Sequence, residues 1–108
     1  MNDDIDSREV WNFAIAEALI GKILLVGITY LNEQGEVIEQ QQFFGRVCSA
    51  HPHQGILLAL QGQREGEHYT LPPDTRSIVE AVPGEYRLYS TGEIVVNPNF
   101  TATFTSPT

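Results

Sequence analysis

The feature that most constrains this fold is the run of large apolar residues from Ile23 to Leu31. The run is rich in β-branched and bulky side chains, and the turn-forming residues 32–35 follow it directly, which predicts a strand. Alternate side chains of a strand point to opposite faces, and here both faces are apolar. One face carries Ile23, Leu25 and Leu31, and the other carries Leu24, Val26, Ile28 and Tyr30. Because such a strand must be covered on both sides, we expect a curled sheet whose opposite wall covers one face.

The second cover is expected to be an amphipathic helix over residues 6–20. Asp6 is a favourable N-cap, and Glu9 lies three residues later in a capping-box pattern. Gly21 can adopt the left-handed conformation that ends a helix. Apolar side chains recur at three- and four-residue spacing at Val10, Trp11, Ala14, Ile15, Ala18 and Leu19. We expect the face of the helix that carries Trp11 to pack on the strand that follows.

The rest of the chain has the pattern of strands separated by turns. A long strand is predicted over residues 36–48, and Gly45 within it permits a sharp bend or a close approach of two backbones. The Pro72-Pro73 pair interrupts the ladder, and Asp74 can then cap a short helical turn. Further strands are predicted at residues 56–60, 67–71, 78–82, 86–89, 94–96 and 100–105.

Together these elements predict one mainly β domain of the α+β class. A chain of 108 residues has the usual size of a single domain. We divide it into a helix (6–20), a β core (22–82) and a C-terminal β extension (83–105). The order of a helix, four meandering strands, a proline-led turn and a fifth strand resembles the small SH3-like and Sm-like barrels. The resemblance implies a strongly bent antiparallel sheet, to which the C-terminal hairpin and strand are added.

The chain is acidic, with 14 acidic and 6 basic residues and a net charge of −8. Half of that charge lies in residues 1–21, where one arginine and five acidic residues give −4. Such a chain repels polyanions unless a local basic patch intervenes. A single cysteine excludes an internal disulfide, and the longest apolar run falls well short of the ~20 residues that span a membrane. With an acidic N-terminus unlike a secretory signal, these features lead us to expect a cytoplasmic protein without a membrane anchor.

The best candidates for a metal site are Cys48, His51 and His53. Thiolate and imidazole groups bind zinc and copper, and in an extended segment the two histidines would project to the same side. Structural zinc sites usually have four ligands, however, and only these three lie near one another in the sequence. The alternative is a polar turn beside a buried cysteine that acts as a small apolar residue. We therefore expect no metal and no cofactor, and we retain the three residues as candidates.

No catalytic residue is predicted. The sequence contains no nucleophile elbow, phosphate loop or dinucleotide fingerprint, and a turn rarely holds a cysteine and a histidine in catalytic geometry. Nucleic-acid binding is the second hypothesis, because the β region holds four arginines and several aromatic residues. Residues 37–92 nevertheless carry a net charge of −2. The residues concerned are Arg46, Arg64, Arg76, Arg87, Phe44, Tyr69, Tyr86 and Tyr89.

The first hypothesis is a non-catalytic interaction module that binds another protein or associates with itself. Small barrels offer exposed strand edges and aromatic grooves, both of which can hold another chain. An acidic domain of this size also fits an inhibitor of a basic partner, such as an immunity protein of a nuclease toxin, because opposite charge raises the association rate. A nucleic-acid-binding barrel is the alternative, and a metal site at Cys48, His51 and His53 is the third.

Overall fold

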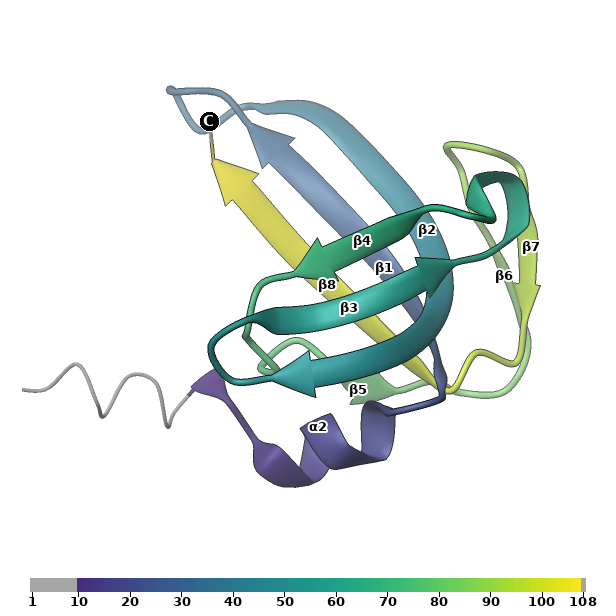
Figure 1. Cartoon of the computed structure of the whole chain (residues 1–108). Helices are drawn as coiled ribbons and strands as arrows, with labels where there is room; N and C mark the ends of the chain where they lie inside the picture. The colour runs from purple at the N-terminus through teal and green to yellow at the C-terminus, as the bar shows by residue number, and fades with distance from the viewer. Residues whose placement is uncertain (1–9, 108) are drawn as a thin grey trace, which may run out of the picture.

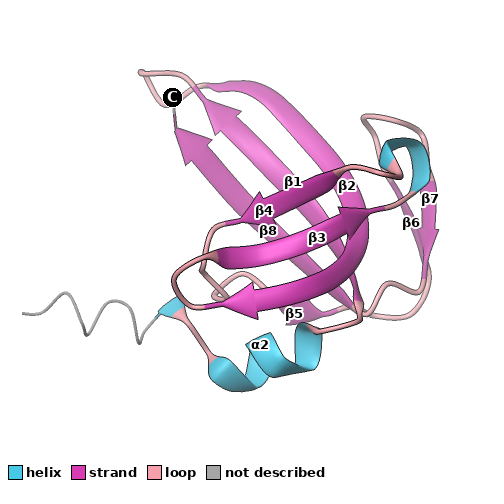
Figure 2. Cartoon of the chain, viewed as in Figure 1, coloured by secondary structure: helices cyan, strands magenta, loops and turns pink. Residues whose placement is uncertain are grey.

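A bent six-stranded sheet forms most of the computed structural model, which describes residues 10–107 (Figures 1 and 2). Its strands are β1 (Ile23–Leu31), β2 (Val37–His51), β3 (Gly55–Leu60), β4 (His68–Leu71), β5 (Val79–Glu80) and β8 (Phe100–Pro107). They are arranged in the order β4-β3-β2-β1-β8-β5. The remaining elements are the helix α2 (Phe13–Leu19), the 3₁₀ turn η1 (Gly62–Arg64) and a separate hairpin of β6 (Glu85–Arg87) and β7 (Ile94–Val96). The chain is therefore mainly β with one short helix.

The sheet is mixed, so the prediction of an antiparallel sheet is wrong at one position. Strand β8 pairs in parallel with β1, from Leu24 opposite Phe100 to Leu31 opposite Pro107. The reason is that β8 enters the sheet beside the start of β1: Asn99 and Ile23 are joined by two hydrogen bonds (2.8 and 3.0 Å), so the two strands run in the same direction. The last strand therefore lies within the main sheet, between β1 and β5, and is not an addition to it.

The bend of the sheet runs through the long strand β2, which is curved in Figure 1. Its first part pairs with β1 as far as Arg46, and its last part pairs with β3 from Gly45 onward. A Cβ atom at Gly45 would contact the carbonyl oxygen of Ala59, so the two backbones approach as closely as glycine permits. The bend expected at Gly45 thus lies where β2 passes from one wall of the sheet to the other.

The helix is shorter than predicted. It begins at Phe13, with Asn12 as its N-cap: the side-chain oxygen of Asn12 accepts a hydrogen bond from the backbone N–H of Ile15 (3.0 Å). The backbone N–H of Asn12 donates to the hydroxyl of Thr75 (2.8 Å), and Asn12 itself has an extended backbone, so the helix does not continue before it. The capping box of Asp6 and Glu9 lies outside the described residues. At the other end the prediction is confirmed, because Gly21 has a φ of +80°.

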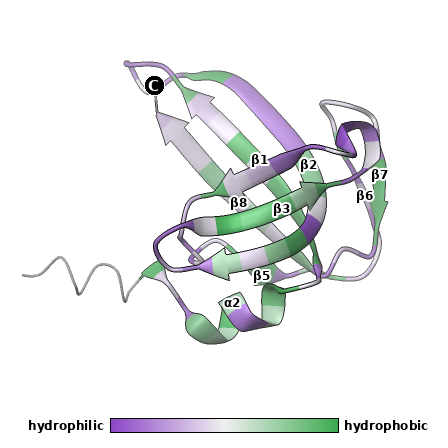
Figure 3. Ribbon diagram, viewed as in Figure 1, coloured by the Kyte–Doolittle hydropathy of each residue, from purple (hydrophilic) through white to green (hydrophobic). Residues whose placement is uncertain are grey.

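The main core fills the inside of the bent sheet, and α2 closes one end of it (Figure 1). Hydrophobic colours gather near the helix in Figure 3, whereas the opposite ends of β1, β2 and β8 are paler or hydrophilic. Trp11 is buried in the same core as β1, as expected, but it precedes the N-cap Asn12 and so lies outside the helix, whose own buried residues are Ala16 and Leu19. The buried members are Trp11, Ala16, Leu19, Leu24, Val26, Ile28, Phe43, Val47, Ile56, Leu58, Leu60, Leu71, Ile78 and Ala102.

The outer face of β1 is covered by the β6–β7 hairpin, where we had expected the helix. Leu88 and Val95 of the hairpin segment are buried against Leu25 of β1, and Phe44 and Tyr86 pack around them. The hairpin connects β5 to β8 and so lies close to the sheet without needing a long linker. It supplies the second apolar cover that the run from Ile23 to Leu31 requires.

Candidate functional site

The bent sheet does not close into a barrel within the described residues, and the gap between its ends is a cleft of about 420 Å³. One side is formed by Tyr69–Leu71 of β4 and the prolines that follow it, and the other by Phe104–Pro107 of β8. Ile28 and Gln54 complete the lining. We call this the edge cleft. Apart from the tyrosine hydroxyl, its lining side chains cannot ionise.

Both strands that border the edge cleft have backbone groups without a neighbouring strand. The backbone N–H of Leu60 donates to the carbonyl of Glu67 (2.9 Å), so by alternation the N–H and C=O groups of His68 and Thr70 point away from β3. Among residues 10–107 no strand lies on that side of β4. Strand β5 pairs with β8 only at Phe100 and Thr101, which leaves the rest of that β8 edge unpaired in the described chain.

An aromatic cluster lies beside the edge cleft. The rings of Phe43 and Tyr69 are 4.7 Å apart between centroids, and the guanidinium of Arg64 lies 5.2 Å from the Phe43 centroid. A side-chain hydrogen bond to Tyr69, together with partial burial, raises the pKa of Tyr30. Arg64 also forms an ion pair with Glu67 (3.0 Å). These contacts fix the orientation of Tyr69, so the apolar wall of the cleft is preformed.

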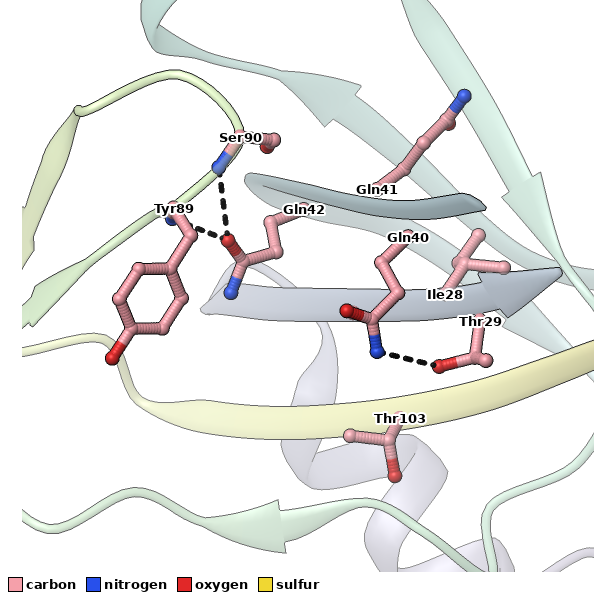
Figure 4. Close-up of a pocket in the computed structure, with 9 residues that line it drawn as sticks. Ile28, Thr29, Gln40, Gln41, Gln42, Tyr89, Ser90 and Thr103 are labelled. Atoms are coloured by element: carbon pink, nitrogen blue, oxygen red, sulfur yellow. Dashed lines mark hydrogen bonds between the residues drawn. The ribbon is translucent and has the colours of Figure 1, made fainter. Parts of the chain in front are cut away.

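A second hollow, of about 590 Å³, lies on the outer face of β1, β2 and β8 (Figure 4). We call it the outer groove. Gln42 anchors the hairpin loop over it, because its side-chain oxygen accepts hydrogen bonds from the backbone N–H groups of Tyr89 (2.6 Å) and Ser90 (3.4 Å). Gln41 points away from the groove in Figure 4, as the alternation along a strand requires. The lining residues are Gly27, Ile28, Thr29, Gln40, Gln41, Gln42, Tyr89, Ser90 and Thr103.

Cys48, His51 and His53 do not form a metal site in the structure. The backbone N–H groups of His53 and Gln54 donate to Nδ1 of His51 (3.1 and 3.3 Å), which occupies one of its two possible ligand atoms. In the part of the chain that is described, no three His, Cys, Asp or Glu side chains are placed to hold a metal ion. Cys48 is exposed, so its expected burial is wrong: the register shift between Val47 and Ser49 leaves it without a partner residue on β3.

Three of the four candidate arginines for nucleic-acid binding have partners within the chain. Besides the contacts of Arg64, Arg46 donates to the carbonyl of Gly21 (2.6 Å). Arg76 donates to both carboxylate oxygens of Asp74, and these hydrogen bonds lower the pKa of that carboxyl group. The three arginines come from different parts of the chain: Arg46 from β2, Arg64 from η1 and Arg76 from the segment between β4 and β5.

The four candidate aromatic residues fall into three places. Phe44 and Tyr86 pack in the hairpin core, and the Tyr86 hydroxyl donates to the carbonyl of Val82 (2.6 Å). Tyr69 lines the edge cleft, and Tyr89 lies beside the outer groove. The sequence thus pointed to Tyr69 in the edge cleft and Tyr89 in the outer groove, although as candidates for nucleic-acid binding.

Sequence reasoning missed Phe104 and the pair Gln40 and Gln42. Phe104 lies in the strand predicted at residues 100–105, but the sequence did not show which strand would lie beside it. The two glutamines are separated by one residue, which places both on one face of a strand. That spacing was a usable signal.

Comparisons with family models, with curated proteins and with solved structures gave no match to this chain. Within residues 10–107, no helix is long and apolar enough to cross a membrane. The edge cleft and the outer groove are the two features of the described chain that bear on function.

Proposed function

We propose that this protein is a non-catalytic interaction module that holds an extended segment of a partner protein in the edge cleft. The observation that carries the proposal is the pair of unpaired strand edges on either side of an apolar hollow. An added strand gains affinity from backbone hydrogen bonds and specificity from pockets for alternate side chains. His68 and Thr70 would supply the backbone groups, while Tyr69 and Phe104 would contact the inward side chains.

The charge around the cleft favours a partner segment with basic residues at one end. Leu31 lies opposite Pro107, so the turn after β1 is beside the C-terminal end of β8, as Figure 1 also shows. Glu33, Glu36 and Glu39 follow in this region, and residues 31–45 contain no lysine or arginine. Together with the net charge of −8, this would speed association with a basic partner. An inhibitor of a basic protein would be an interaction module with this charge.

Proline residues limit the length of both edges, which favours a short segment over pairing between two copies. Pro72 and Pro73 directly follow β4, and Pro107 ends β8. Proline cannot donate to a ladder, and it is one means by which proteins protect exposed edges. The likeness to SH3-like and Sm-like barrels belongs to the same proposal, since the partner strand would fill the gap that keeps the sheet open.

Selection of random peptides displayed on phage, followed by affinity measurement with synthetic peptides, tests the proposal. We expect peptides with alternating apolar residues and a basic end, bound with a Kd of about 1–100 μM. Thr70→Pro removes one N–H on the free edge of β4 without removing a bond to β3, and it should weaken binding roughly tenfold. Thr70→Ala keeps that N–H and serves as the matched control.

Equal affinity of the Thr70→Pro and Thr70→Ala proteins, both shown to be folded by thermal unfolding, would contradict the proposal. So would a selection that yields only acidic peptides. Sedimentation of the protein alone shows whether the strand edge of β4 pairs with a second copy of this chain. A dimer that Thr70→Pro converts to a monomer would assign the edge to that second copy.

A further inference from the structure

The outer groove presents side-chain hydrogen-bonding groups whose directions are fixed. Both N–H groups that contact Gln42 donate to its oxygen, so the amide orientation is set by its partners and the NH₂ group is directed away from them (Figure 4). No described residue accepts a hydrogen bond from that NH₂ group. Gln42 therefore offers the groove a pair of donors, and it does so because it holds the hairpin loop in place.

The neighbouring polar groups supply acceptors on the same face. Gln40 lies two residues before Gln42, and its NH₂ group reaches the hydroxyl of Thr29 (3.5 Å), which leaves its own carbonyl oxygen as an acceptor. Thr103 of β8 also lines the groove. Gly27 of β1 has no side chain to fill the bottom of the groove. A Cβ atom there would have only Thr103 Cγ2 within 4 Å, at 3.9 Å.

Tyr89 stands beside these groups with 89% of its surface exposed. An aromatic side chain this exposed contributes little to the core, yet its backbone is held by Gln42 at 2.6 Å. Figure 4 shows the ring at one end of the groove, on the same side as the glutamine amides. The ring therefore offers a flat apolar surface next to alternating donors and acceptors.

From these features we infer that the outer groove is a binding site for a neutral carbohydrate. A pyranose ring has an apolar C–H face that stacks on an aromatic ring, and its hydroxyls both donate and accept hydrogen bonds. Apart from the Tyr89 phenol, no side chain that lines the groove can ionise, and the chain as a whole is strongly acidic. Phosphorylated or carboxylated ligands would thus find no cation, and neutral sugars are favoured.

An extended peptide is a less suitable ligand for this groove. The floor is formed by β1, which has β2 on one side and β8 on the other, so its backbone groups are already paired. Strand addition is therefore available at the edge cleft but not here. Only side chains recognise a ligand in the outer groove, which agrees with recognition of separate hydroxyl groups.

Titration of the ¹⁵N-labelled protein with neutral hexasaccharides of glucose, xylose and N-acetylglucosamine tests this site. We expect at least one to shift the Gln42 side-chain NH₂ and Tyr89 backbone signals, with a Kd of about 1 mM. Tyr89→Ala should weaken that binding about tenfold, whereas Tyr89→Phe, which keeps the ring, should retain it. Gln42→Glu keeps an acceptor for the two backbone N–H groups but removes the NH₂ donors, and it should also weaken binding about tenfold.

A hexasaccharide of galacturonic acid and a neutral peptide rich in glutamine and threonine are the control ligands. The inference is overturned if no neutral sugar shifts these signals at ~10 mM, or if Tyr89→Ala leaves the affinity unchanged. Tighter binding of either control ligand at the same residues would assign the groove to that ligand class instead. Because Tyr89 is exposed and outside the core, its variants are expected to fold normally.

Discussion

At the scale of single residues, the close contact between β2 and β3 at Gly45 constrains the fold. A Cβ there would lie 2.9 Å from Cα of Leu60 and would also meet the Ala59 carbonyl, and both are backbone atoms that cannot rotate away. We expect Gly45→Ala to lower the free energy of unfolding by about 1–3 kcal/mol, because the sheet must shift to admit one methyl group. Urea unfolding followed by Trp11 fluorescence measures this.

Gly27→Ala is the matched control, since it makes the same change in a neighbouring strand. The nearest atom to its Cβ would be 3.9 Å away, so we expect a change within about 0.5 kcal/mol. Similar losses in the two variants would show that the effect at Gly45 reflects general strand propensity and not the close approach.

At the scale of elements, the hairpin of β6 and β7 depends on a few apolar contacts with the outer face of the sheet. Leu88 is fully buried there and Ile94 is 49% exposed. We expect Leu88→Ala to cost about 2–4 kcal/mol and to loosen the hairpin, so that trypsin cleaves after Arg87 faster than in the wild-type protein. Ile94→Ala should change neither property appreciably. Unchanged cleavage in the Leu88 variant would mean that the hairpin is held by other contacts.

At the scale of the whole molecule, the fold is opposed by its own charge. The net charge is −8, and the ion pairs of the described residues, Arg64 with Glu67 and Arg76 with Asp74, each have one exposed and one half-buried partner. The radius of gyration is 14.2 Å, whereas the screening length is ~30 Å at 0.01 M salt and ~10 Å at 0.1 M. Repulsion therefore acts across the whole molecule only at low salt.

Raising the sodium chloride concentration from ~0.01 M to ~0.1 M should thus increase the free energy of unfolding, by on the order of 1 kcal/mol. Urea midpoints measure the effect. Potassium chloride should act equally, because screening depends on ionic strength. A midpoint that falls with salt would show that favourable ion pairs outweigh the repulsion.

The sequence by itself determined the approximate positions of the strands, the turn after Leu31 and the C-terminal end of the helix, because the forces behind them act over a few residues. A run of β-branched and bulky apolar residues marked the strand from Ile23 to Leu31, and Gly21 has the left-handed conformation that its position required. The local turn after Leu31 formed as expected, with Asn32 accepting hydrogen bonds from Gln34 and Glu36. Two residues of the hollows, Tyr69 and Tyr89, were also identified as potential ligand contacts.

Only the tertiary structure decided which elements pair or pack with one another. The parallel pairing of β8 with β1, the cover of Leu25 by the hairpin and the hydrogen bond from Tyr89 to Gln42 join residues 47 or more apart in the chain. Periodicity gives the direction in which a side chain points but not the neighbour that it meets. Both hollows are formed by such long-range contacts. The edge cleft lies between β4 and β8, and the outer groove lies between the hairpin loop and the sheet.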